Sequence, residues 1–86
     1  MAAALQIWSN TFCRDFDRLP PQVQEAIQAK IDEMGTRLDS FPHHRLTGRR
    51  ESRLRVGDYR VLYECDLALG RIYLLYVGHR REVYRR

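Results

Sequence analysis

The spacing of apolar residues changes along the chain from helical to strand-like. The apolar segment LQIW at residues 5–8 predicts a short strand, and the SNT that follows it supplies capping groups for a helix beginning near Phe12. Pro20 and Pro21 end that helix and open a second one, because proline suits the first turn of a helix, where its missing N–H is not needed.

The second helix is predicted from Pro21 to about Leu38. Its apolar residues lie three and four positions apart and therefore share one face. They are Val23, Ala26, Ile27, Ile31, Met34 and Leu38. Since almost no loop separates the two helices, we expect an antiparallel helix hairpin whose apolar face packs on a sheet.

Residues 39–51, DSFPHHRLTGRRE, predict a loop that contains Pro42 and Gly48. Three strand-length segments follow it: SRLRV, YRVLYECD and RIYLLYVG. Their short connections predict an antiparallel meander, which the N-terminal strand joins at an edge or beside the last strand. The expected fold class is α+β, with the N-terminal strand and the helix hairpin packed on one face of a curved antiparallel β-sheet and the other face free.

Composition fits a single domain over residues 1–86, since 86 residues with 44% hydrophobic content leave little room for a second unit. The two cysteines have neither disulfide-scaffold nor zinc-ligand spacing, and adjacent His43 and His44 cannot chelate one ion well. We therefore expect free thiols and no metal site. The chain also shows no signal peptide and no run of about 20 apolar residues, which favours a cytoplasmic protein.

Charge is distributed unevenly between the two halves of the sequence. Residues 1–44 carry four cations and six acids, a net charge of −2, whereas residues 45–86 carry eleven cations and five acids, a net charge of +6. Fourteen of the fifteen cations are arginine, whose planar fork binds phosphate at two points. The second half therefore predicts a polyanion partner. The alternative is an arginine-rich solvated surface without a specific ligand.

Strand alternation gathers several of these arginines on the free face of the predicted sheet. Arg53 and Arg55 are two residues apart and project to the same side of their strand. Arg60 opens the neighbouring strand, and Arg80 follows the end of the last one, with Tyr84 near the chain end. We expect these groups to converge on one concave surface that fits a phosphodiester backbone.

The segments RLTGRRESRLRVGDYRVLYECD and IYLLYVGHRREVYRR resemble the RelE branch of the RelE/ParE superfamily of toxin–antitoxin proteins. FCRDFDRLPPQVQEAI also has that family's pattern of a short helix, a Leu-Pro break and a longer helix, so the resemblance spans essentially the whole chain. It implies a microbial-RNase-like fold and the toxin of a type II toxin–antitoxin system. The implied activity is a ribosome-dependent mRNA endonuclease, or mRNA interferase, that cuts mRNA in the A site.

The same resemblance implies the chemistry and the partners. Cleavage uses the RNA's own 2′-hydroxyl and needs no metal or other cofactor. The expected partners are a cognate RelB-like antitoxin, the ribosome with its mRNA, and operator DNA that the toxin–antitoxin complex represses. No membrane partner is implied.

Residue roles follow from matching positions in the family's pattern. Arg53 and Arg60 would hold the scissile phosphate, Arg80 would stabilise or protonate the leaving group, and Tyr84 would act as base or stack on the substrate. Glu51 stands where relatives have a cation, and arginine is a poor proton donor, so His79 is a candidate general acid or a further RNA contact. The arginines expected to bind RNA are Arg45, Arg49, Arg50, Arg55 and Arg81.

Two other functions fit the same sequence. One is a ParE-like toxin that inhibits DNA gyrase by protein contact and does not cleave RNA. The other is a catalytically inactive toxin fold that acts only as the partner of a DNA-binding antitoxin. Arg53, Arg60, Arg80 and Tyr84 argue against the gyrase inhibitor. A role as partner of a DNA-binding antitoxin need not exclude the nuclease.

Overall fold

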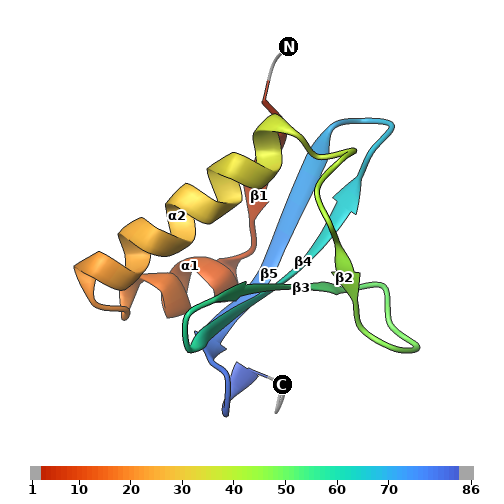
Figure 1. Ribbon diagram of the computed structural model, residues 1–86. Coiled ribbons are helices and arrows are strands. Elements are labelled where there is room, and N and C mark those ends of the chain that lie inside the picture. Colours follow the sequence, from red (N-terminus) through yellow and green to blue (C-terminus); the bar gives the residue numbers. More distant parts are fainter. Residues whose placement is uncertain (1–2, 84–86) are drawn as a thin grey trace.

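The computed structural model describes residues 3–83, and within them it contains two helices and one five-stranded sheet (Figure 1). The elements in chain order are β1 (Leu5–Trp8), α1 (Asn10–Asp17), α2 (Pro21–Thr36), β2 (His44–Arg45), β3 (Ser52–Val56), β4 (Tyr59–Asp66) and β5 (Arg71–His79). The strand order is β1-β5-β4-β3-β2. β1 pairs with β5 in parallel, and the other neighbours are antiparallel. The predicted α+β class is confirmed, and the N-terminal strand lies beside the last strand. The expected antiparallel arrangement holds for every pair of neighbours except β1 and β5.

The helix hairpin begins and ends close to where the sequence predicts. The Ser9 hydroxyl accepts a hydrogen bond of 3.0 Å from the Phe12 amide, which caps α1 so that it begins at Asn10, slightly earlier than expected. Pro21 opens α2 as predicted, and α2 ends at Thr36 instead of Leu38. No helix in residues 3–83 has the length and apolar character needed to cross a bilayer.

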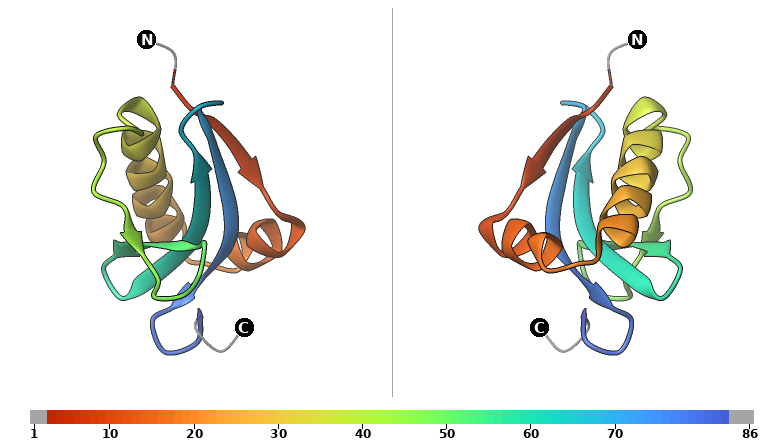
Figure 2. Two further views of the ribbon diagram at one scale, coloured as in Figure 1. Left: turned by 90° about the vertical axis from the view of Figure 1, so that its right-hand side faces the viewer. Right: turned by 90° about the vertical axis from the view of Figure 1, so that its left-hand side faces the viewer.

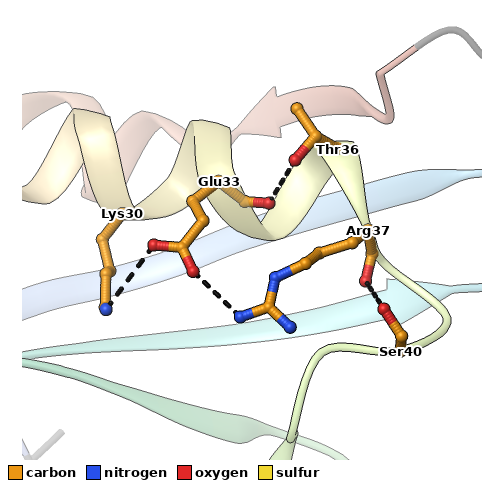
Figure 3. A network of polar contacts seen from close by, with 5 residues as sticks. All are labelled: Lys30, Glu33, Thr36, Arg37 and Ser40. Carbon is orange, nitrogen blue, oxygen red and sulfur yellow. Dashed lines mark hydrogen bonds and ion pairs between the residues drawn. The ribbon is translucent and has the colours of Figure 1, made fainter.

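Polar contacts hold the C-terminal end of α2 on its solvent side (Figure 3). Glu33 accepts a 2.9 Å hydrogen bond from the Arg37 guanidinium and lies 3.6 Å from the Lys30 ammonium. The hydrogen bond to Arg37 and the charge of Lys30 lower the pKa of Glu33 below its ordinary value. Beyond the helix, the Ser40 hydroxyl donates to the Arg37 carbonyl at 3.3 Å.

The core lies between the helix hairpin and one face of the sheet. The views of Figure 2 show both helices on the same side of the strands, in front of them on the right and behind them on the left. The fully buried core residues are Phe12 from α1, Ile27, Ile31 and Met34 from α2, and Val61, Tyr63, Ile72, Leu74 and Val77 from the sheet. Of the predicted α2 stripe, Ala26 alone is exposed. The prediction that the helices cover one face is confirmed.

β2 lies inside the segment that the sequence predicts as a loop. His44 pairs with Arg53, and Arg45 pairs with Ser52, in an antiparallel ladder at the edge of the sheet. The prediction of a loop over residues 39–51 is wrong at these two residues. A two-residue strand is too short to show an alternating pattern in the sequence, so only its pairing with β3 reveals it.

His43, directly before β2, ties this segment to the sheet and to the end of α2. Its Nε2 donates to the Leu38 carbonyl at 2.7 Å, which leaves Nδ1 to accept from the Tyr63 hydroxyl at 2.5 Å. Burial raises the pKa of the Tyr63 phenol, so the hydroxyl keeps its proton. His43 therefore joins the segment after α2 to the middle of the sheet.

An irregularity in the β4–β5 ladder changes which side chains of β5 face the core. Leu62 pairs with Tyr76, whereas the next residue, Tyr63, pairs with Leu74, so Leu75 is an extra residue in β5. As a result, Leu74 and Val77 both face the core although three positions separate them. Tyr76 faces the other side of the sheet.

Candidate nucleic-acid interface

The face of the sheet opposite the helices is called the open face here, and it is turned toward the viewer in the left view of Figure 2. Residues that alternate with the core positions lie on it, in two rows across the strands. The first row is Arg53, Leu62 and Tyr76. The second row is Arg55, Arg60 and Gly78. The predicted convergence of β3 and β4 arginines on one face is thus present.

Arg55 and Arg60 stand directly opposite each other on neighbouring strands. Like charges in that relation destabilise a sheet. Arg60 is only 7% exposed, and its Nη1 donates to the carbonyls of Gly57 and Tyr59, each at 2.8 Å. Arg55 is exposed. The pair therefore combines one guanidinium fixed by the hairpin turn with one that reaches into solvent.

Arg80 is held by the same hairpin turn. Its amide donates to the Asp58 carbonyl at 2.8 Å, and its Nε lies 4.0 Å from Asp58 Oδ1. Its side chain is nevertheless 52% exposed, which makes the Asp58 contact a weak restraint. Arg60 and Arg80 are far apart in sequence. The carbonyls that hold them nevertheless belong to consecutive residues at the β3–β4 turn, namely Gly57, Asp58 and Tyr59.

Beyond Arg80 the chain turns back toward the sheet. Arg81 is exposed, whereas Val83 is buried and packs where Gly78 has no side chain; a Cβ at Gly78 would lie 3.8 Å from the Val83 Cβ. Tyr84, predicted as base or stacking residue, lies outside the described residues. The chain therefore folds back onto the end of β5 at Val83.

The β2–β3 loop lines one side of a cavity. The Arg45 Nε donates to the Arg49 carbonyl at 3.1 Å, and the Arg49 and Glu51 side chains form an ion pair. Arg50 is exposed in the same loop. Glu51 is therefore neutralised by Arg49 and shapes the loop.

This loop reaches across the open face toward the start of α1. A cavity of about 310 Å³ is lined by Ser9, Thr11, Arg49, Glu51, Leu75 and Tyr76. Tyr76 was not predicted as a functional residue, because regular alternation from Leu74 would turn it into the core. The adjacent Leu74 and Leu75 are the one sign of the extra residue in the sequence.

His79 lies on the helix side of the sheet. Its ring is 5.8 Å from that of Tyr59, which packs against the core, and its Nδ1 accepts from the Arg81 amide at 3.3 Å. The structure therefore does not bring His79 together with Arg53 and Arg55. Adjacent residues of a strand point to opposite faces of the sheet. Gly78 is on the open face, so His79 is on the face that carries the helices.

Comparisons with known proteins agree with this architecture. A family model described as the ParE toxin of the type II toxin–antitoxin system parDE matches residues 7–84. No curated protein sequence matches the chain. Among solved structures, a chain of the RelBE2 toxin–antitoxin complex from Mycobacterium tuberculosis is 25% identical, with 95% of this chain and 97% of that chain covered and a TM-score of 0.74.

Two further structures resemble the chain in fold. One is the RelB–RelE antitoxin–toxin complex from Methanococcus jannaschii, 24% identical over 92% of this chain and 95% of that chain, with a TM-score of 0.72. The other is the isolated RelE toxin of E. coli, 14% identical over 90% of this chain and 84% of that chain, with a TM-score of 0.77. At these identities the likeness carries the fold alone.

Proposed function

Because the chain belongs to the RelE/ParE superfamily of type II toxin–antitoxin toxins, we propose that it is a ribosome-dependent mRNA endonuclease that stops translation. The observation that carries this proposal is the open face, where Arg53, Arg55 and Arg60 lie on adjacent strands with Arg80 anchored to the turn between those strands. A phosphodiester lying between Arg55 and Arg60 would relieve the repulsion of two opposed cations.

The proposed reaction is attack by the RNA's own 2′-hydroxyl on the adjacent phosphorus. The bond from phosphorus to the 5′-oxygen breaks, which leaves a cyclic phosphate and a 5′-hydroxyl. Arg53 and Arg60 bind the phosphate and stabilise the charge that develops on its oxygens. Arg60 suits this role because its hydrogen bonds to two carbonyls hold the guanidinium in place before substrate binds.

Proton transfer is assigned to the end of the sheet where Arg80 leaves β5. Tyr84 is proposed to accept the 2′-proton, helped by the neighbouring cations, and Arg80 to stabilise the departing oxygen, which takes its proton from water. His79 lies on the other side of β5, and its Nδ1 accepts a hydrogen bond from the Arg81 amide. Its proposed part is therefore to fix the turn that carries Arg80.

The partners of this activity are also proposals. Members of the superfamily act with an antitoxin, and the structural relatives named above include complexes of RelE-type toxins with RelB antitoxins. We propose a RelB-like antitoxin whose acidic segment covers the open face, a cytoplasmic site of action on the ribosome, and co-repression of the operon by the complex. Arg45, Arg49, Arg50 and Arg81 would add contacts to RNA phosphates.

The family model favours a second candidate, since its description names ParE toxins. In that case the protein inhibits DNA gyrase by direct contact and leaves RNA intact. A supercoiling assay with purified gyrase distinguishes the two, because the nuclease leaves supercoiling unchanged.

Primer extension on mRNA bound to programmed ribosomes tests the proposed function. Purified antitoxin-free protein is compared with Arg53→Ala, with an Arg80→Ala, Tyr84→Phe double variant, and with Arg14→Ala as a control on the exposed side of α1. We expect cuts within the A-site codon for the wild type and the control, and at least about 100-fold slower cleavage for the other two variants. Intact mRNA with folded wild-type protein would overturn the proposal.

A further inference from the structure

A cavity of about 390 Å³ opens on the helix side of the sheet, next to the turn that carries Arg80. It is called the α1–β5 cavity here. Four parts of the chain line it: the end of α1, the α1–α2 connection, the start of β4, and the end of β5 with the turn that follows. The lining residues include Arg18, Leu19, Pro20, Tyr59, His79 and Glu82. Its volume is within the range of small-molecule sites.

The walls of the cavity combine two aromatic rings with apolar surface, and hydrogen bonds hold the turn beside them. The Tyr59 and His79 rings meet edge to face at 5.8 Å and 77°, and Leu19 and Pro20 add apolar surface. The Glu82 amide donates to the His79 carbonyl at 2.8 Å, and the Arg81 amide donates to the His79 ring. Such a preformed space between aromatic and apolar side chains suits a planar ring.

The polar groups at the edge decide which ring fits. Three charged residues line the cavity: Asp15, Arg18 and Glu82. Within residues 3–83, neither Arg18 nor Glu82 takes part in an ion pair. A carboxylate accepts from ring N–H and amine groups, whereas a guanidinium donates to paired acceptors. Guanine offers both, because it carries adjacent N–H and NH₂ donors on one edge and the O6 and N7 acceptors on another.

We propose that the α1–β5 cavity is a guanine-binding subsite for a nucleotide of the RNA that lies on the open face. Glu82 accepts from the donor edge of the base, and Arg18 binds O6 and N7. Because the Tyr59 and His79 rings stand at 77° to each other, one of them contacts the plane of the base and the other meets its edge. The inference rests on the proposed nuclease function, because the cavity borders the turn that presents Arg80 and Arg81 to a phosphate chain. It explains why a carboxylate, Glu82, stands directly beside those arginines.

Mononucleotide titrations followed by NMR test this without ribosomes. 5′-GMP is compared with 5′-UMP, which carries the same phosphate but lacks the amine and the N7 acceptor. We expect GMP to bind about tenfold more tightly than UMP and to shift the amide signals of Leu19, His79 and Glu82. Arg18→Ala and Glu82→Gln should each remove that preference, whereas Arg14→Ala and Glu25→Gln, exposed changes outside the cavity, should keep it.

The outcomes separate this inference from the proposed function. Equal binding of GMP and UMP, or a GMP preference that survives both Arg18→Ala and Glu82→Gln in folded protein, overturns the guanine subsite even if mRNA is cleaved on ribosomes. A GMP preference together with intact mRNA leaves the subsite standing and removes the nuclease. Amide spectra of each variant without nucleotide establish that it is folded.

Discussion

His43 and Tyr63 form the polar contact that joins the segment after α2 to the middle of the sheet. Replacing His43 by alanine removes the hydrogen bonds that it makes with the buried Tyr63 hydroxyl and the Leu38 carbonyl. We expect His43→Ala to lower the free energy of unfolding by about 1–3 kcal/mol, measured by urea denaturation at neutral pH. His44→Ala, an exposed neighbour, should change it by less than about 0.5 kcal/mol. Equal losses in the two variants would contradict the role of this contact.

Tyr63 also predicts how stability changes at alkaline pH. Burial raises its pKa, so the folded chain keeps the phenolic proton at a pH where the unfolded chain releases it. Its contribution is therefore complete below about pH 10 and is lost as pH rises further. In urea unfolding between about pH 8 and 11, the wild type should lose stability more steeply than Tyr63→Phe, by at most about 1.4 kcal/mol per pH unit. Parallel pH profiles would refute this account.

At the scale of elements, the β3–β4 hairpin combines structure with the proposed chemistry. Arg60 bonds two carbonyls of its turn, whereas its cross-strand partner Arg55 is exposed. We expect Arg60→Ala to lower the free energy of unfolding by about 1–3 kcal/mol and Arg55→Ala to leave it within about 0.5 kcal/mol. Urea denaturation of both variants measures the difference. A similar stability for the two would mean that the carbonyl contacts of Arg60 contribute little to the stability of the fold.

The strands and helices themselves are largely predictable from the sequence, for identifiable reasons. Ser9 and Pro21 mark helix starts by their hydrogen-bonding chemistry, and the β3 and β4 segments have the alternation of half-buried strands. β2 is missed because a strand of two residues is too short to show an alternation of apolar and polar positions. The facing of β5 beyond Leu75 is missed because an extra residue in one strand reverses the alternation after it, and the adjacent Leu74 and Leu75 alone do not show where that reversal occurs.

At the scale of the molecule, the sequence predicts which arginines share a face better than it predicts how each is held. Arg53 and Arg55 follow from alternation alone. The burial of Arg60 against its turn, the neutralisation of Glu51 by Arg49, and the placement of His79 with α1 depend on contacts between distant segments. The family resemblance implies the roles of these positions, but side chains that reach across a turn or a cavity are fixed only by the packed structure.

The uneven charge of the whole chain predicts a salt dependence that separates a phosphate-binding face from a merely basic surface. Binding of a short unstructured RNA should weaken linearly on a logarithmic salt scale, with a slope of about −0.7 for each neutralised phosphate of a single strand. Arg53→Ala should make that slope shallower by about 0.7, because Arg53 lies on the open face. Fluorescence anisotropy across a salt series measures both slopes.

Arg37→Ala is the matched control, since it also removes one cation from the molecule. Arg37 is paired with Glu33 on the solvent side of α2, away from the open face (Figure 3). Its loss should leave the slope unchanged, although the net charge falls as much as in Arg53→Ala. Equal effects of the two substitutions would mean that the RNA responds to total charge, and the open face would then lose its claim to be a specific phosphate-binding surface.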